Sequence, residues 1–292
     1  MWKRIGTAVV LIGVVLGTLL GLRQISLYFA DALAMLVVAL GIYEMVTALR
    51  AAQYRPFVVP LVLGAITLYP AARFFGAAGI AVAICVTTVA AIMYLTFGEY
   101  ELQDLFATVF IAIYPMGIFG TFFLINRSPI GMLAILWMLL VPILTDTMAY
   151  FVGITCKGPK LCPNISPKKT ISGAIGGVLG GVLGSMSVYV LFDVTGAMRV
   201  FGNVGALSLG GIIGNGAAIA VYVAVGLIGG VLCEIGDLGA SRIKRKAGIK
   251  DFGKIFPGHG GMMDRLDSIL FIMPIIYAIT VVATYVQTGA LS

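Results

Sequence analysis

One stretch of the chain, residues 241–267, carries most of the residue types that could do chemistry. It reads SRIKRKAGIKDFGKIFPGHGGMMDRLD and holds seven Lys or Arg residues, three Asp residues and the one His of the chain, His259. Cations, carboxylates and a flexible glycine turn together suit a metal-bound polyphosphate better than they suit protein packing. The stretch therefore indicates a site for a ligand that contains phosphate.

Two aspartates near the end of this stretch, Asp264 and Asp267, stand three residues apart. In a helix that spacing puts both carboxylates on one face, where they repel each other unless a cation lies between them. Taken alone, the pair is better read as two solvated acids at a helix N-terminus. Mg²⁺ takes one or two protein carboxylates and fills its other positions with water and substrate phosphates. With the neighbouring cations in view, we predict Asp237, Asp264 and Asp267 as Mg²⁺ ligands and leave a second cation open.

Basic residues precede the glycine turn PGHGG, whose N–H groups are able to line an anion. They are Lys244, Arg245, Lys246, Lys250 and Lys254. Without the aspartates, a cluster of four to eight Lys or Arg would indicate a surface for anionic lipids. With them, it predicts phosphate binding. Lys250 and His259 are further catalytic candidates, and we expect His259 to position a group rather than to transfer a proton.

A second loop, residues 157–177, reads KGPKLCPNISPKKTISGAIGG and has four lysines and no acidic residue. Ser166 or Thr170 is placed to cap the glycine-rich helix that follows, and Lys168 and Lys169 stand beside the cap. The N-terminus of a helix attracts phosphate through its free N–H groups and its positive dipole end. The loop therefore resembles phosphate-binding loops in its residue types, although it has no G-x-x-x-x-G-K-[ST] pattern.

The elements that must position these loops are membrane helices. The chain is 60% hydrophobic and 11% charged, whereas a soluble protein carries about 25% charged residues. We predict an all-α, polytopic membrane protein with about nine transmembrane helices and an active site at their cytoplasmic ends. The first apolar run is longer than that of a secretory signal, so we expect it to be an anchor. The candidate spans are Ile5–Leu22, Leu27–Leu49, Phe57–Ala72, Phe75–Phe97, Leu105–Leu124, Ile130–Phe151, Ile171–Phe192, Ala206–Ile235 and Ile269–Val286.

Basic residues set the orientation of these spans. With the N-terminus inside, fifteen Lys or Arg residues face the cytoplasm and four face the outside, as the positive-inside rule requires. We therefore expect a multi-pass protein of the cytoplasmic membrane whose N-terminus and catalytic loops are cytoplasmic. Residues 1–127 would form a scaffold, and residues 128–292 would carry the catalytic loops. Asp146, Glu44 and Glu234 lie near inner span ends, where an acid either reaches the headgroups or is paired and functional.

The seventh span carries two interleaved ladders of glycines four residues apart, Gly173–Gly177–Gly181 and Gly176–Gly180–Gly184. Such a helix has a broad flat side that another backbone can approach closely, so we predict tight helix packing. The ladders permit a homodimer without requiring one. A transporter or channel is the weaker interpretation, because the chain shows no internal repeat and its charges gather at the inner ends of spans.

At this point the residues resemble a known family. The run S-x-I-K-R-x4-K-D-x-G-x2-F-P-x-H-G-G-M-x-D-R-L-D, from Ser241 to Asp267, is similar to the defining motif of phosphatidate cytidylyltransferases, also called CDP-diacylglycerol synthases. The resemblance extends to GDL at residues 236–238, to D-x-x-A-Y-x-x-G from Asp146 and to I-S-P-K-K-T at residues 165–170. One position departs from the family, which commonly has an acidic residue where this chain has Ser172.

The resemblance implies attack of the phosphatidate phosphate on the α-phosphorus of CTP, giving CDP-diacylglycerol and pyrophosphate. It implies CTP, phosphatidate and the lipid bilayer as partners, with no nucleic acid. Another lipid phosphate as the acceptor is the alternative. Asp237, Asp264, Asp267, Lys250 and His259 would be catalytic. The substrate-binding candidates are Asp146, Ser166, Lys168, Lys169, Thr170, Ser241, Lys244, Arg245, Asp251 and Arg265.

Overall fold

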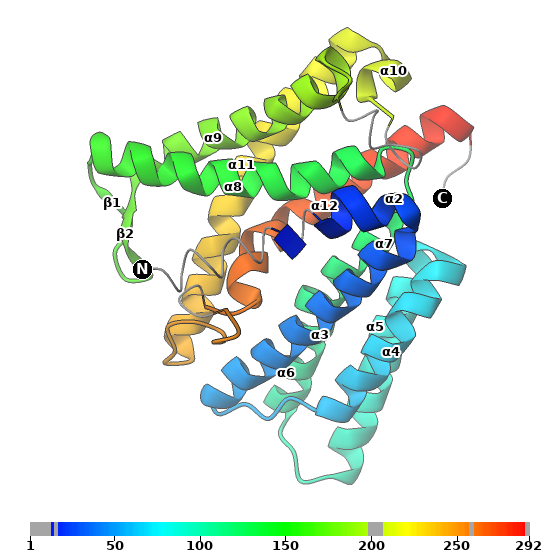
Figure 1. Cartoon of the computed structure of the whole chain (residues 1–292). Helices are drawn as coiled ribbons and strands as arrows, with labels where there is room; N and C mark the ends of the chain where they lie inside the picture. Colours follow the sequence, from blue (N-terminus) through cyan, green and yellow to red (C-terminus); the bar gives the residue numbers. More distant parts are fainter. Residues whose placement is uncertain (1–12, 15–16, 198–206, 257–259, 290–292) are drawn as a thin grey trace. The chain divides into compact units, whose positions relative to one another are not determined.

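The computed structural model describes residues 13–14, 17–197, 207–256 and 260–289, and most of them are helical (Figure 1). Among these residues, eight helical stretches are long and apolar enough to cross a membrane, which confirms the all-α polytopic prediction. They are α3 (Leu27–Ala51), α4 (Val58–Phe75), α5 (Ala77–Phe97), the run from α6 to α7 (Leu102–Ile125), α8 (Gly131–Thr155), the run of α9 and η3 (Ile171–Val194), α11 (Asn215–Lys246) and α12 (Met263–Thr288).

These eight stretches correspond to the last eight predicted spans, and the short third span is the helix α4. The first predicted span, Ile5–Leu22, falls largely outside the described residues, so the count of nine stays a prediction. The shorter elements and the parts of the composite runs are η1 (Gly17–Leu22), α2 (Arg23–Ile25), α6 (Leu102–Ile111), η2 (Ala112–Ile118), α7 (Phe122–Ile125), β1 (Lys160–Cys162), β2 (Ser166–Thr170), α9 (Ile171–Tyr189), η3 (Val190–Val194) and α10 (Leu209–Ile213).

Two helix boundaries differ from the prediction. The predicted span Ala206–Ile235 is interrupted at Gly214, whose φ of 84° ends α10 before α11 begins. The helix α11 then continues past the apolar run to Lys246. Lys and Arg are good helix formers and are favoured at the negative end of the helix dipole, so the basic run extends the helix instead of ending it.

Packing divides the chain into two compact units. Unit 1 consists of Met1–Leu124 with Ile243–Leu266, and unit 2 of Ile125–Arg242 with Asp267–Ser292. Most of the motif stretch therefore lies in unit 1, and the lysine loop lies in unit 2. The predicted division at residue 127 concerns the roles of the two halves, so it stays a prediction.

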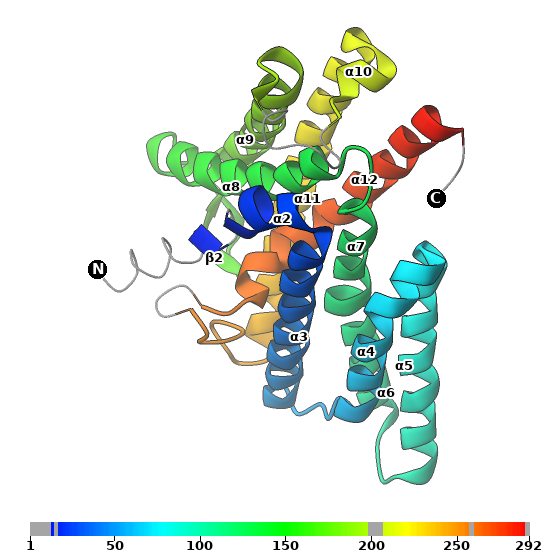
Figure 2. The same ribbon diagram turned by 45° about the vertical axis from the view of Figure 1, so that its right-hand side comes forward.

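In unit 1, the helices α3 to α6 lie side by side (Figure 2). Leu61, Leu68 and Ile111 are completely buried among them. Asp31, on α3, is also buried and accepts a hydrogen bond from the Tyr69 hydroxyl at 3.0 Å. This bundle presents the C-terminal end of α3 to the motif stretch of the same unit.

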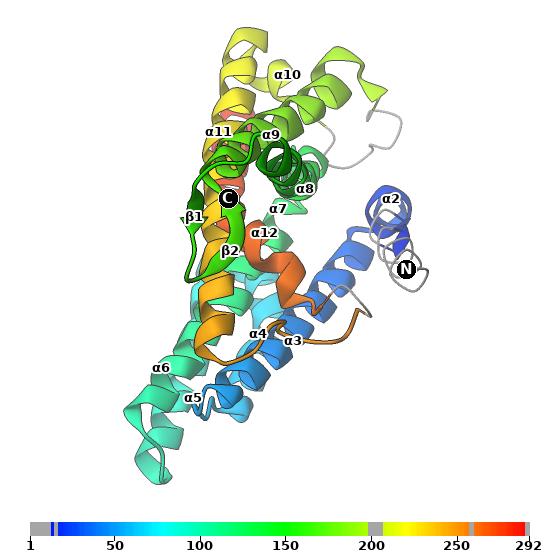
Figure 3. The ribbon, with the colours of Figure 1, turned by 90° about the vertical axis from the view of Figure 1, so that its left-hand side faces the viewer.

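In unit 2, α8 and α9 run along each other, and the strands β1 and β2 form an antiparallel pair next to α9 (Figure 3). The glycine ladders of α9 face two neighbours. A Cβ on Gly176 would lie 2.5 Å from the Val152 side chain of α8, and one on Gly181 would lie 2.8 Å from Gly230 of α11. These close approaches of backbone confirm the predicted role of the ladders in tight helix packing.

Candidate active site

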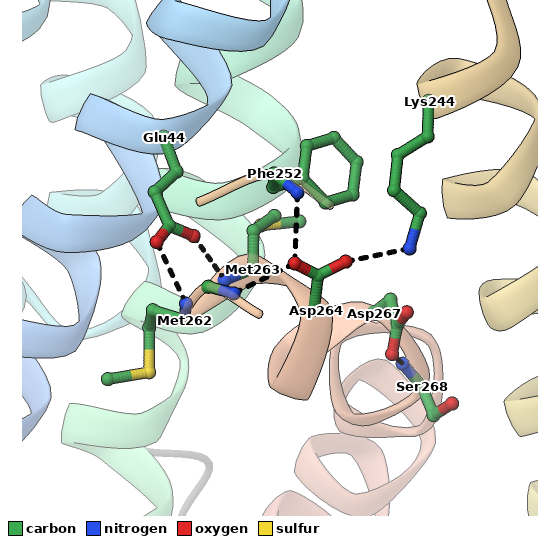
Figure 4. A network of polar contacts seen from close by, with 9 residues as sticks. Glu44, Lys244, Phe252, Met262, Met263, Asp264, Asp267 and Ser268 are labelled. Carbon is green, nitrogen blue, oxygen red and sulfur yellow. Dashed lines mark hydrogen bonds and ion pairs between the residues drawn. The ribbon is translucent and has the colours of Figure 1, made fainter. Parts of the chain in front are cut away.

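The motif stretch is organised around the carboxylate of Asp264, in the first turn of α12 (Figure 4). Its Oδ1 accepts from Lys244 Nζ at 2.7 Å, and both side chains are largely buried. Its Oδ2 accepts the backbone N–H groups of Phe252 and Gly261, each at 2.9 Å. One aspartate therefore fixes the end of α11, the middle of the loop and the glycine turn.

The start of α12 is held by Glu44, a residue of α3 that is only 1% exposed. Its Oε1 accepts the N–H of Met262 at 3.0 Å, and its Oε2 accepts the N–H of Met263 at 2.8 Å (Figure 4). The first N–H groups of a helix have no partner within the helix, so Glu44 supplies a cap from a distant part of the sequence. A Cβ on Gly253 or Gly261 would collide with this carboxylate, which explains why both positions are occupied by glycine.

In unit 2, Lys169 joins two carboxylates of α11. Its Nζ lies 2.6 Å from Glu234 Oε2 and 2.6 Å from Asp237 Oδ2. Burial by itself would lower the pKa of Lys169, but the charges of Asp237 and Glu234 outweigh it, so the pKa stands above its usual value. The other oxygen of Glu234, Oε1, is buried and has no hydrogen-bond partner among the described residues. The lysine is therefore held protonated, in a place fixed by α11.

The strand β2 and the start of α9 shape the loop around this lysine. Thr170 is the residue that caps α9, since its Oγ1 accepts the N–H of Gly173 at 3.1 Å. Ser166 instead lies at the other end of β2 and pairs with Cys162. Ser172, the position that departs from the family, donates from its hydroxyl to the carbonyl oxygen of Lys157 and so ties the loop to α9.

A pocket of about 610 Å³ opens among these elements of unit 2. Residues of three sequence segments line it, including the whole predicted D-x-x-A-Y-x-x-G set of α8. The charged and hydroxyl-bearing lining residues are Asp146, Tyr150, Lys157, Lys160, Lys168, Lys169, Thr170 and Glu234. Four lysines and two acids give the pocket lining a net positive charge, which suits a polyanion such as a nucleoside triphosphate.

The profile described as the cytidylyltransferase family matches residues 2–283. The chain belongs to the cytidylyltransferase family. It is similar to the phosphatidate cytidylyltransferase of Staphylococcus aureus (strain COL), with 34% identity over 161 residues, which are 55% of this chain and 54% of the relative.

The same name is carried by a relative from Brucella melitensis biotype 1, which is 36% identical over 150 residues, 51% of this chain and 47% of the relative. A third, from Staphylococcus haemolyticus (strain JCSC1435), is 34% identical over 161 residues, 55% of this chain and 54% of the relative. The chain spans about half the length of the curated relatives that it matches.

The site residues predicted in the motif stretch fall into three groups, which differ in their burial and in their partners. Asp264 and Lys244 meet directly, as described. Arg245, Lys250 and Asp251 are exposed, and neither Arg245 nor Lys250 forms an ion pair within the described part of the chain, so both remain available to an anion. The remaining three are Ser241, which is half-buried, Arg265, which is exposed, and His259, which lies outside the described residues.

Asp267 is buried in unit 2, where its Oδ1 accepts the N–H of Ser268 at 2.8 Å. It stands on α12 with Asp264, as the prediction of a helical pair requires. Lys244 and two N–H groups already balance the charge of Asp264, so partners within the protein relieve the expected repulsion.

The carboxylates fit a magnesium ion in donor type, since Mg²⁺ prefers oxygen ligands and needs only one or two from the protein. Asp237 is the most open of the three predicted ligands, with 31% of its side chain exposed. Across the described ranges, no group of three or more His, Cys, Asp or Glu side chains is gathered as a metal site. The magnesium ligands therefore stay a prediction.

Glu44 and Glu234 are the residues whose roles sequence reasoning left undecided. The sequence predicts both near span ends, where an acid is able to reach the headgroups. In the structure both are buried and bonded, at 1% and 7% exposure. The sequence does hold one indication of these roles: an acid buried in an apolar helix costs free energy, so its presence favours a fixed partner.

Proposed function

We propose that the chain is a phosphatidate cytidylyltransferase, which transfers the cytidylyl group of CTP to phosphatidate and forms CDP-diacylglycerol and pyrophosphate. The observation that carries this proposal is the lysine-lined pocket of unit 2, built from the segments that resemble the family. Membership of the cytidylyltransferase family and the names of the relatives support it. The membrane helices give a place for the acyl chains of both lipids.

The chemistry requires charge neutralisation and alignment more than a strong base. The attacking phosphate of phosphatidate is already an anion at neutral pH, so no covalent intermediate is needed. Lys168 and Lys169, with Lys157 and Lys160, would hold the phosphates of CTP or of the lipid. The N-terminus of α9, capped by Thr170, adds its dipole beside them.

A magnesium ion would neutralise the triphosphate when bound, and we propose Asp237, Asp264 and Asp267 as its ligands. The carboxylate of Asp237 is fixed by Lys169, and that of Asp264 by Lys244, so both are oriented in advance. Arg245, Lys250 and Arg265 would contact phosphates from the motif stretch. Whether a second cation joins the first stays open in this proposal.

The proposal includes an orientation and an oligomeric state. The positive charge of the loops supports an N-terminus and two catalytic loops in the cytoplasm, where CTP is found. The glycine ladders of α9 are used inside the chain, so a homodimer would need another surface. Ile175, Leu179 and Leu183 form an exposed apolar stripe on the same helix, which suits contact with lipid or with a second copy.

The decisive test is release of pyrophosphate from CTP by the purified protein, with phosphatidate and Mg²⁺ varied in turn. We expect activity that requires both, and loss of at least about 100-fold in Lys169→Met, because one fixed electrostatic contact contributes about 10²–10³ in rate. Arg73→Met, which removes an exposed cation in the last turn of α4, is the control. Turnover with an isoprenoid ether lipid phosphate but not with phosphatidate would contradict the proposed acceptor.

A further inference from the structure

We propose that unit 1 carries a second anion site, made of residues that the active site does not use, and that it binds the phosphate of an anionic phospholipid headgroup. The site is a cavity of about 530 Å³ where the loop between α3 and α4 meets the loop between α5 and α6. Both loops lie at the same end of the bundle (Figure 2). Its main polar and aromatic lining residues are Arg50, Tyr54, Arg55, Phe57, Tyr94 and Tyr100.

The charge of this cavity is positive and unpaired. Arg50 and Arg55 are its charged lining residues, both are exposed, and neither makes an ion pair with another described residue. Asp104 is engaged by backbone instead, since it accepts the N–H of Arg55 at 2.6 Å and the N–H of Glu101 at 3.2 Å. Glu99 and Glu101 are exposed on the neighbouring loop and do not line the cavity.

The loop that carries Arg55 is held in place before any ligand arrives. In addition to the contact with Asp104, the N–H of Phe57 donates to Thr108 Oγ1 at 2.9 Å. The Phe57 ring packs edge-on against Tyr100, with ring centroids 4.8 Å apart. A loop already fixed loses little conformational freedom on binding, so its contacts with a ligand are retained as affinity.

The surroundings of the two arginines favour a lipid over a soluble anion. Arginine binds phosphate through paired N–H groups, and basic residues next to a span attract anionic lipids. Tyr54, Tyr94 and Tyr100 are of the type that gathers at a membrane interface. Val58 and Val59, exposed at the start of α4, offer an apolar rim for an acyl chain. A free phosphate would use the arginines and leave this rim without a partner.

The test measures lipid binding alone, so it does not depend on the proposed function. The full chain, purified in detergent, is titrated with phosphatidylglycerol, and bound lipid is counted by native mass spectrometry. We expect Arg50→Ala/Arg55→Ala to weaken binding about 30-fold, that is about fivefold to sixfold per arginine. Arg73→Ala is the matched control, because Arg73 is an exposed arginine in the last turn of α4, whereas the cavity is lined by the first turn of that helix.

Two further arms identify the ligand. Neutral phosphatidylcholine should bind more weakly than phosphatidylglycerol and should not respond to the double substitution, and excess inorganic phosphate should not displace the lipid. Equal binding by the double variant and the Arg73→Ala control would overturn the site. Displacement by inorganic phosphate would overturn its assignment to lipid. If the alanine variant loses its thermal transition, Arg50→Gln/Arg55→Gln is titrated in the same way, with the same expected loss.

Discussion

Replacing Glu44 by Gln tests whether this acid positions the motif stretch. In the structure its two oxygens accept two backbone N–H groups at the start of α12, and the side chain is 1% exposed. The amide of Gln offers one acceptor oxygen, and its NH₂ group would face the second N–H, donor against donor. One hydrogen bond to a charged group is therefore lost, and one buried N–H is left without a partner.

The size of this effect follows from those two changes. A hydrogen bond to a charged group contributes about 1.5–3 kcal/mol, and a buried donor left unsatisfied costs about 1–3 kcal/mol. We expect Glu44→Gln to lower the free energy of unfolding by about 3 kcal/mol, which shifts the unfolding equilibrium about 100-fold. Asp264 stands one residue after the capped N–H of Met263, so CTP turnover should fall as well.

The assay is denaturant unfolding in detergent, together with pyrophosphate release from CTP. Glu99→Gln, which removes an exposed acid of the α5–α6 loop, is the control and should stay close to the parent protein in both measurements. A Glu44→Gln protein that unfolds within about 0.5 kcal/mol of the parent, as a surface substitution does, would refute the capping argument.

Three further predictions follow from the site and its packing. Asp264→Asn should abolish metal-dependent CTP turnover while the protein still inserts in the membrane, because the amide cannot supply the negative charge that faces Lys244. Normal turnover in this variant would contradict the metal assignment. Gly181→Ala should destabilise the protein by about 1–3 kcal/mol, measured by thermal unfolding, because its Cβ would overlap the backbone of α11, whereas Gly216→Ala meets nothing within 4 Å and serves as its control. The Lys169 ion pairs should stabilise the fold fully below the usual lysine pKa of 10.5, and this stabilisation should be lost as the pH rises through the raised pKa of the folded state. The difference in unfolding free energy between the parent and Lys169→Met should therefore be constant near neutral pH and shrink above about 10.5. A difference that already changes near neutral pH would contradict this.

The membrane helices could be predicted from sequence because an apolar run of about 20 residues has few alternatives. Their ends were harder to predict, since hydropathy does not register that the basic run after Ile235 continues as helix to Lys246. The break at Gly214 depends on one positive φ, which composition does not reveal. Ser166 and Thr170 were equal candidates for the cap of α9, and the decision rests on where β2 ends.

The candidate site was predictable in its residue types and less so in its pairings. Asp264 was expected to need a cation, and the structure supplies Lys244 from twenty positions earlier in the chain. Glu44 stands more than 200 residues from the N–H groups that it accepts. A pairing at that distance leaves no local pattern in a single sequence. The need for glycine at positions 253 and 261 becomes clear only from the structure, in which Glu44 lies against both residues.

The two glycine faces of α9 also bear on the order in which the protein is built. One face packs on α8, which precedes it in the chain, but the other waits for α11. Gly226, which meets Gly181, is synthesised about 45 residues later, a delay of about 2–9 seconds at ordinary translation rates. Until then, Lys169 lacks both of its carboxylate partners, because Glu234 and Asp237 come later still. The lysine-lined pocket of unit 2 is thus completed only after α11 is made, and a nascent chain halted before α11 would hold an unneutralised lysine at the membrane surface.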